Sequence, residues 1–204
     1  MTNIIRGLMG KRWMAMSALV LGGTTLSSCS VSLPTRPIAE QKKAVELYKW
    51  WGDDMKGAPA VKIVLDEQKA HIYRGGAEAG WTMLATGKPG HPTPTGSFTV
   101  MEKIQDKKSN TYGYIADKDG NVVNGDAMAG VTPVPAGCRY VAAPMPFWMR
   151  LTSYGVGMHA GEIPDPGLPA SHGCIRLPVE MAQKLFEVVD VGTSVTISGT
   201  APQS

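Results

Sequence analysis

The sequence has little charge of either sign and no long hydrophobic run, and these shortages exclude several classes of protein. Only 18% of its 204 residues are charged, while 43% are hydrophobic and 24 are glycine. This composition is typical of a folded, turn-rich domain rather than a disordered chain or a helical bundle. We find no internal repeat and no low-complexity segment. The length therefore predicts one compact domain with appendages.

The net charge of +3 does not indicate a nucleic-acid partner. Residues 1–28 contain three basic residues and no acid, so the rest of the chain holds 17 basic and 17 acidic residues. Phosphate backbones are bound by basic surfaces, and no surplus of basic residues is left to form one. We expect no nucleic acid among the partners.

The N-terminus has the pattern of an export signal. Arg6, Lys11 and Arg12 precede an apolar run from Trp13 to Leu26. That run of about 14 residues is marginal for crossing a hydrocarbon core ~30 Å thick. Basic residues, a short apolar run and small residues at its end together predict a secretory signal over residues 1–28.

The end of this signal, Leu26-Ser27-Ser28-Cys29, resembles a bacterial lipobox. The resemblance implies cleavage before Cys29 and acylation of that residue. Acyl chains contribute about 0.8 kcal/mol per buried CH₂, so a multiply acylated Cys29 would hold the protein on a membrane. We expect an exported protein, lipid-anchored at a bacterial membrane and facing the cell wall on the periplasmic side. An ordinary secreted protein or a single retained anchor helix are the alternatives.

Residues 29–57 are predicted to form a lipid-anchored tether followed by an amphipathic helix. Two prolines mark residues 30–38 as a tether. Over residues 39–55, apolar side chains recur at helical spacing with charges on the other faces. The apolar stripe consists of Ala44, Leu47, Tyr48, Trp51 and Met55.

Residues 58–200 are predicted to form a mainly β domain with few helices. Val61, Ile63 and Leu65 alternate with more polar residues, which predicts a strand and, with residues 70–74, a hairpin. Further strands are expected at 81–86, 97–101, around the turn Asp119-Gly120, at 147–152, 157–159 and 194–197. The proline-rich residues 131–146 are expected to be irregular. Pro178 fits the first turn of a helix that follows.

The chemistry of the chain is concentrated in Ser171-His172-Gly173-Cys174-Ile175-Arg176, with His159 fifteen positions before the cysteine. A thiol close to imidazoles is typical of nucleophilic catalysis. A neighbouring imidazolium or the N-terminus of the following helix is expected to lower the pKa of Cys174. Backbone N–H groups near Gly173 and Cys174 are candidates for an oxyanion hole, and Arg176 for a carboxylate-binding residue.

The residues alone leave three other interpretations of Cys174 open. Cysteine is often a buried core residue. His159, His172 and Cys174 could instead ligate zinc with one position left open. Cys138 and Cys174 could form a disulfide, because an exported protein meets oxidising conditions.

Three segments of the chain, in the same order, resemble the signature of the L,D-transpeptidase catalytic domain, the YkuD-like family. His159 followed by Ser171-His172-Gly173-Cys174-Ile175-Arg176 is similar to its catalytic motif. Pro92-Thr93-Pro94-Thr95-Gly96-Ser97-Phe98 resembles its Thr-Pro-Thr-Gly turn, and Met145-Pro146-Phe147-Trp148 its Met-Pro-aromatic segment. The resemblance covers residues 60–198 and implies a β-sandwich-like domain with a few helices.

The resemblance also implies a role for each site residue. Cys174 would be the acyl-accepting nucleophile and His159 its general base and acid, with the imidazole oriented by the backbone carbonyl of Ala160. Gly173 would contribute to the oxyanion hole. Substrate-binding roles are expected for Ser171, His172 and Arg176.

A reaction and its partners follow from the same resemblance. Cys174 would attack a peptidoglycan tetrapeptide stem, release D-Ala and pass the acyl group to an amine, which cross-links or remodels the wall. The alternatives are a hydrolytic L,D-carboxypeptidase and a non-catalytic peptidoglycan-binding lipoprotein. Carbapenems are expected to acylate the same cysteine. No metal or other cofactor is implied.

Overall fold

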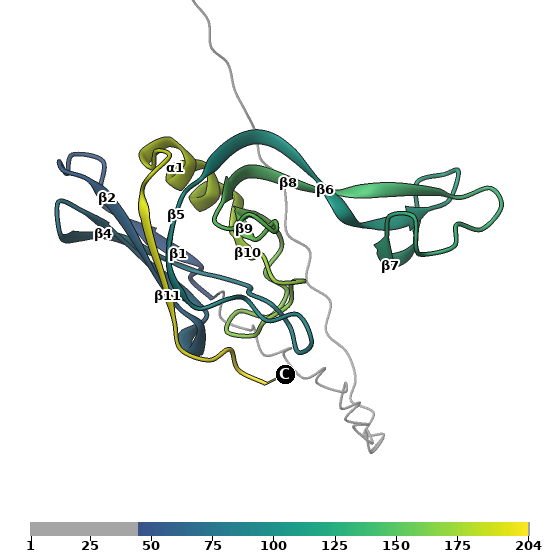
Figure 1. Cartoon of the computed structure of the whole chain (residues 1–204), viewed down its shortest axis with the longest axis horizontal. Helices are drawn as coiled ribbons and strands as arrows, with labels where there is room; N and C mark the ends of the chain where they lie inside the picture. The colour runs from purple at the N-terminus through teal and green to yellow at the C-terminus, as the bar shows by residue number, and fades with distance from the viewer. Residues whose placement is uncertain (1–44, 204) are drawn as a thin grey trace, which may run out of the picture. The chain divides into compact units, whose positions relative to one another are not determined.

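The computed structural model describes residues 45–203, which form two β-sheets and one α-helix (Figure 1). The predicted signal, Cys29 and the tether lie outside the described residues, as does the first part of the predicted helix. Within residues 45–203, no helix combines the length and the hydrophobicity that a membrane span requires.

The first sheet has six strands in the order β1-β4-β3-β2-β11-β5. Their bounds are Tyr48–Trp50 for β1, Pro59–Val64 for β2, Lys69–Arg74 for β3, Ala77–Met83 for β4, Gly96–Thr99 for β5 and Ser194–Ser198 for β11. The predicted hairpin is present as β2 and β3, which are joined by the 3-10 turn Leu65–Glu67. The predicted final strand is confirmed as β11, which pairs in parallel with β2.

The second sheet has five strands in the order β10-β9-β8-β6-β7. Their bounds are Glu102–Ala116 for β6, Val122–Met128 for β7, Arg139–Arg150 for β8, Gly157–Ala160 for β9 and Ile175–Leu177 for β10. The predicted strand pair around Asp119-Gly120 is confirmed as β6 and β7. Helix α1, Val179–Val188, follows β10 as expected, with Pro178 as its N-cap residue.

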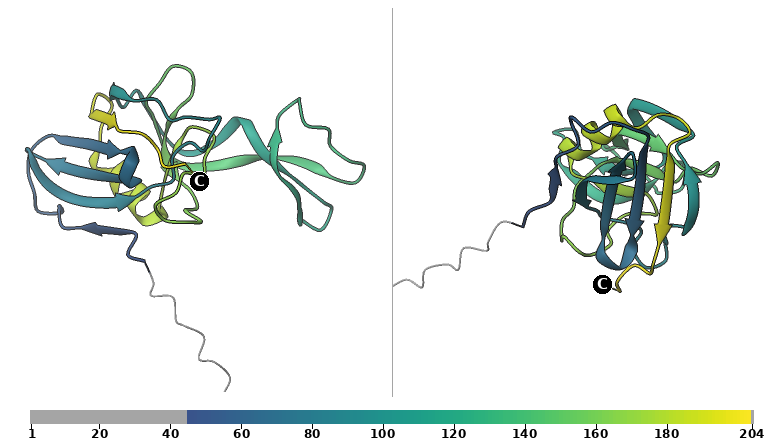
Figure 2. Two further views of the ribbon diagram at one scale, coloured as in Figure 1. Left: turned by 90° about the horizontal axis from the view of Figure 1, so that it is seen from below. Right: turned by 90° about the vertical axis from the view of Figure 1, so that its left-hand side faces the viewer.

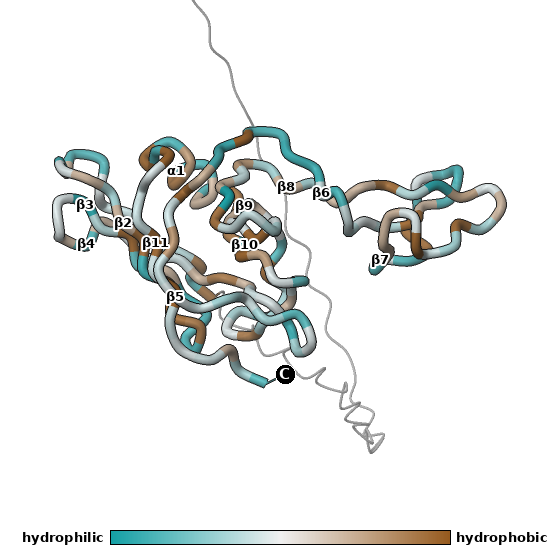
Figure 3. Tube along the Cα trace, viewed as in Figure 1, coloured by the Kyte–Doolittle hydropathy of each residue, from teal (hydrophilic) through white to brown (hydrophobic). Residues whose placement is uncertain are grey.

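One hydrophobic core joins the two sheets and the helix, which confirms the mainly β, sandwich-like fold. Val61, Ile63 and Ile72 of the first sheet are buried in the same cluster as Met149 and Met158 of the second. Buried α1 side chains, among them Leu185, complete it. Figure 3 shows hydrophobic stretches along α1, β10 and β11 in this part of the molecule.

The distal parts of β6 and β8 continue beyond this core, together with β7 (Figures 1 and 2). We call residues 109–143 the arm and the other described residues the body. Six of the seven β7 residues are exposed. The arm therefore contributes little to the core.

The helix predicted over residues 39–55 is wrong where the structure describes it, because Tyr48–Trp50 forms β1. This strand pairs antiparallel with β4, and Trp50 lies against Gly80, where a Cβ atom would be 2.8 Å from its ring. Sheet pairing with a distant strand thus overrides the local helical spacing.

The irregular segment predicted over residues 131–146 is also wrong in its second half, which belongs to β8. Prolines lack the N–H that a central strand needs. However, β9 pairs only with Met149 and Arg150 of β8, so one edge of β8 is open at Pro144 and Pro146. The open edge accommodates both prolines within a strand.

Candidate active site

Strands β9 and β10 bring His159 and Arg176 together, and β10 starts directly after Cys174. They pair in parallel, with His159 opposite Arg176 and Met158 opposite Ile175. Paired residues of a sheet project from the same face, so His159 and Arg176 are neighbours. Cys174 comes directly before β10, two residues from Arg176.

His159 is held by its own backbone neighbourhood. Its side chain is buried, with the residue 6% exposed, and its Nδ1 lies 2.8 Å from the carbonyl oxygen of Ala160. Because a carbonyl only accepts, Nδ1 carries the hydrogen and Nε2 keeps a lone pair. Burial lowers the pKa of His159 to about 4, so the imidazole is neutral at pH 7. The hydrogen bond expected with Ala160 is present, and it leaves Nε2 able to act as a base.

The environment of Cys174 corrects one expectation from the sequence. Burial raises the pKa of its thiol, and this outweighs the opposing effects of a backbone hydrogen bond with Gly157 and of the Arg176 charge. The helix expected to lower the pKa begins only at Val179, beyond β10. The thiol is therefore protonated at neutral pH and needs a base to become a nucleophile.

Hydrogen bonds from Ser171 fix the loop that carries the thiol. The buried Ser171 Oγ donates to the carbonyl oxygen of Cys174 at 2.6 Å and accepts from the Gly173 N–H at 3.1 Å. Its backbone accepts from Lys88 and donates to Thr86. Ser171 thus has a structural role in the loop; its predicted contact with substrate stays a prediction.

Thr93, in the Pro-Thr-Pro-Thr-Gly segment, is a site residue that sequence reasoning did not single out. Its hydroxyl donates to the Gly173 carbonyl at 2.9 Å and accepts from the Gly87 N–H at 2.9 Å. Gly173 itself has a φ of +108°, a conformation that side chains other than glycine rarely adopt. Thr93 therefore ties the second motif of the sequence to the cysteine loop.

The same contacts refine the predicted oxyanion hole. The Gly173 N–H is already engaged by Ser171 Oγ. Among the hydrogen bonds of residues 45–203, the Cys174 N–H has no acceptor. The Cys174 N–H is thus the donor that this structure leaves for an oxyanion.

Arg176 carries an unpaired charge beside His159. Its Cγ and Cδ lie 2.9 and 3.0 Å from where a Cβ on Gly161 would be, so glycine is needed there for the side chain to pass. Within the part of the chain that the structure describes, no acid lies within salt-bridge distance of it. No acid of the described residues therefore competes for the guanidinium, and its contact with a substrate carboxylate stays a prediction.

His172 is surrounded by residues from two other segments. Its Nε2 lies 2.9 Å from Asp126 Oδ1 of β7, and its ring stacks on Tyr112 of β6 with centroids 4.3 Å apart. His91 meets it edge-on at 4.7 Å. Sequence analysis placed His172 in the site but missed Asp126 and Tyr112, whose motif-free segment carries no signal for them.

Two of the alternatives for Cys174 can be compared with the structure. Cys138 and Cys174 are both free thiols, so they do not form a disulfide here. Among residues 45–203, no group of three His, Cys, Asp or Glu side chains is placed to hold a metal ion.

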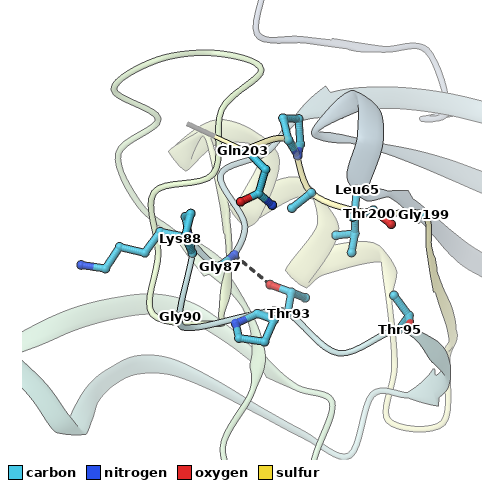
Figure 4. A pocket seen from close by; sticks show the side chains of 13 residues that line it. Leu65, Gly87, Lys88, Gly90, Thr93, Thr95, Gly199, Thr200 and Gln203 are labelled. Carbon is cyan, nitrogen blue, oxygen red and sulfur yellow. Dashed lines mark hydrogen bonds between the residues drawn. The ribbon is translucent and has the colours of Figure 1, made fainter.

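A cavity of about 360 Å³ lies beside the Thr93 segment. Residues 87–95 form one wall and the C-terminal residues 199–203 the other (Figure 4). The Lys88 side chain points away from it in this view. Its lining does not include Cys174 or His159, so it is separate from the thiol site.

A match to a known protein family shows the class of protein in which this arrangement of thiol and imidazole occurs. The model of the L,D-transpeptidase catalytic domain, YkuD, matches residues 58–197. The chain belongs to this family.

A relative of known sequence and two solved structures agree with this membership. "Probable L,D-transpeptidase 3" of Mycobacterium tuberculosis is 26% identical over an alignment of 202 residues, and the match covers 96% of this chain and 65% of the relative. The L,D-transpeptidase of Enterococcus faecium, solved as a cysteine-to-serine mutant, is 25% identical with a TM-score of 0.51, over 70% of this chain and 50% of that one. The Ldtfm–avibactam carbamoyl enzyme is 26% identical with a TM-score of 0.51, over 69% and 49%. This chain thus spans about two thirds or less of the length of these relatives.

Proposed function

We propose that the chain is a peptidoglycan L,D-transpeptidase in which Cys174 is the nucleophile and His159 the base. One observation carries the proposal: the bond from His159 Nδ1 to the Ala160 carbonyl leaves a neutral Nε2 beside the cysteine loop. The raised pKa of Cys174 makes such a base necessary. Membership of the family supports the same chemistry.

In the first step, His159 Nε2 takes the thiol proton while the sulfur attacks the carbonyl that precedes the terminal D-Ala of a tetrapeptide stem. The Cys174 N–H donates to the developing oxyanion. The C–N bond then breaks, the imidazolium returns the proton to the amine of D-Ala, and a thioester remains. Arg176 binds a substrate carboxylate in this proposal, and a guanidinium suits such a group because it can donate two parallel hydrogen bonds.

In the second step, an amine attacks the thioester and passes a proton to His159, and the thiolate of Cys174 leaves and is reprotonated. An amine of another stem gives a cross-link, whereas water gives a shortened stem. We further propose that carbapenems acylate Cys174. The carbamoyl enzyme formed by a relative with avibactam supports this.

The proposal includes lipid anchoring at Cys29 and a position facing the cell wall. The basic residues, apolar run and lipobox-like Leu26-Ser27-Ser28-Cys29 support it. Metabolic labelling with an alkyne fatty acid tests it. Label on the wild type that is absent from Cys29→Ala is expected; equal labelling of both would contradict it.

The test of the activity uses the purified full chain and a disaccharide tetrapeptide, with Cys174→Ala as the control. Products are followed by intact mass. A cross-linked dimer that lacks one D-Ala, absent in the control, is expected. Tripeptide stems alone would show a carboxypeptidase, and no Cys174-dependent product with reductant present would overturn the enzyme assignment.

A further inference from the structure

We infer that Asp126, on the arm, is a positioning residue that holds the His172 imidazole in one tautomer and one orientation beside the cysteine loop. The tautomer and orientation of His172 do not depend on which reaction the chain catalyses. Its consequence for turnover rests on the proposed function.

The carboxylate of Asp126 connects the arm to two segments of the body. Oδ1 lies 2.9 Å from His172 Nε2, and Oδ2 lies 3.1 Å from Lys88 Nζ. The Lys88 hydrogen bond is the main cause that lowers the pKa of Asp126, so the carboxylate is ionised at neutral pH. A negative carboxylate oxygen 2.9 Å from Nε2 repels a lone pair there, which favours the tautomer with the hydrogen on His172 Nε2.

The ring is also restrained on its faces. Tyr112 stacks on it at an interplanar angle of 16°, and His91 packs against it at 75°. Among the described residues, His172 Nδ1 has no hydrogen-bond partner. With Nε2 protonated and the ring neutral, Nδ1 presents a lone pair, two residues before the nucleophile.

The charges around the ring make Asp126 necessary for this arrangement. Burial and the nearby charges of Lys88, His91 and Arg176 lower the pKa of His172, and Asp126 alone acts against them. Without Asp126 the imidazole stays neutral, because the remaining groups repel a proton. What it loses is the negative charge beside Nε2 that favours the Nε2–H tautomer.

A purely stabilising role does not fit the exposure of these groups. The Asp126 side chain is 58% exposed and that of Lys88 35%. Exposed ion pairs contribute little to the stability of proteins, so this pair does little to hold the arm. By contrast, a second group that fixes the tautomer of a site histidine commonly matters for activity.

The test compares three variants of the full chain. Asp126→Ala removes the carboxylate beside His172, whereas Asp126→Glu keeps a carboxylate on the same strand. Asp119→Ala is the matched control, because Asp119 pairs with Lys118 on the same arm but at the β6–β7 turn. For each we measure kcat and KM for D-Ala release from a disaccharide tetrapeptide, the thermal midpoint, and the His172 tautomer by ¹⁵N NMR of the imidazole, assigned with His172→Gln.

We expect Asp126→Ala to lower kcat about tenfold, within the hundredfold range that misplaced groups cost, with KM changed less than about twofold. The Nε2–H tautomer of His172 should give way to a mixture with Nδ1–H. Asp126→Glu should recover most of the kcat and most of the Nε2–H tautomer, and Asp119→Ala should match the wild type.

An unchanged tautomer in Asp126→Ala would overturn the inference, and so would an unchanged kcat in an active enzyme. Equal loss in Asp126→Ala and Asp126→Glu with a lower thermal midpoint would show a structural role instead. If the wild type releases no D-Ala, the proposed function fails, while the NMR comparison still decides whether Asp126 sets the tautomer.

Discussion

Both site histidines belong to the body, but they are fixed in different ways. One is fixed by the body itself and the other by side chains of the arm. In the body, buried His159 is fixed by the backbone carbonyl of the next residue. Beside the arm, half-buried His172 is fixed by the side chains of Asp126 and Tyr112. The first arrangement is local to the chain and sheltered from water, whereas the second depends on side chains more than 40 positions away in the sequence.

This difference shows how the fold divides the work of the site. A backbone acceptor is present in any sequence that forms β9, so His159 needs no acidic partner. The Asp126 side chain that fixes His172 belongs to the arm and can be changed without altering the body. We therefore expect the body to determine whether acyl transfer occurs at all, and the arm to determine how well the loop is oriented.

The largest effect is expected for His159→Ala. It removes the base that a thiol with a raised pKa requires, so D-Ala release should fall about 100- to 10,000-fold. The ratio of this loss to the tenfold loss expected for Asp126→Ala measures how much more strongly D-Ala release depends on the body than on the arm. Losses of equal size in the two variants would remove the distinction between body and arm.

The second effect is on stability at acid pH. The folded-state pKa of His159 is lowered to about 4, so between pH 6.5 and 4 the unfolded chain takes up a proton that the folded chain does not. The free energy of unfolding should fall by about 3 kcal/mol as the pH drops through this window. Above pH 6.5 the contribution of His159 to stability is fully present. Urea unfolding of the wild type and of His159→Gln measures it; parallel pH profiles would contradict the prediction.

Ser171→Ala tests the cysteine loop of the body, which contacts the arm through His172. The residue is 1% exposed, and the change leaves the Gly173 N–H and the Cys174 carbonyl without their partner. We expect the free energy of unfolding to fall by about 1–3 kcal/mol and activity to fall with it. Ser171→Thr, which keeps the hydroxyl, is the control; a loss in Thr equal to that in Ala would show that the hydroxyl bonds are not the cause.

A matched pair of valines gives the smallest effects. Val195 of β11 is 0% exposed, whereas Val131 of the arm is 70% exposed. Truncation to alanine should cost about 2 kcal/mol at Val195 and under about 0.5 kcal/mol at Val131. Chemical denaturation compares them, and similar costs would mean that the arm is covered in the native protein.

The sequence predicted the features that depend on local pattern. Period-two alternation predicted the β2–β3 hairpin, whereas the Ala160 acceptor for His159 was implied by the resemblance of the motif around Cys174 to a known family. It failed at Tyr48–Trp50, where pairing with β4 outweighs helical spacing. It also missed Asp126 and Thr93, which reach the site only through folding, and it predicted the wrong direction for the pKa of Cys174, because burial is not visible in a sequence.

The most direct test of the account is to trap the acyl-enzyme. The full chain is mixed with a disaccharide tetrapeptide, quenched in acid and analysed by intact mass and peptide mapping, alongside Cys174→Ala and His159→Ala. We predict a thioester on Cys174 with one D-Ala released per adduct, none in Cys174→Ala, and slow formation in His159→Ala. An adduct at another residue, or D-Ala release by Cys174→Ala, would contradict the assignment of Cys174 as the nucleophile.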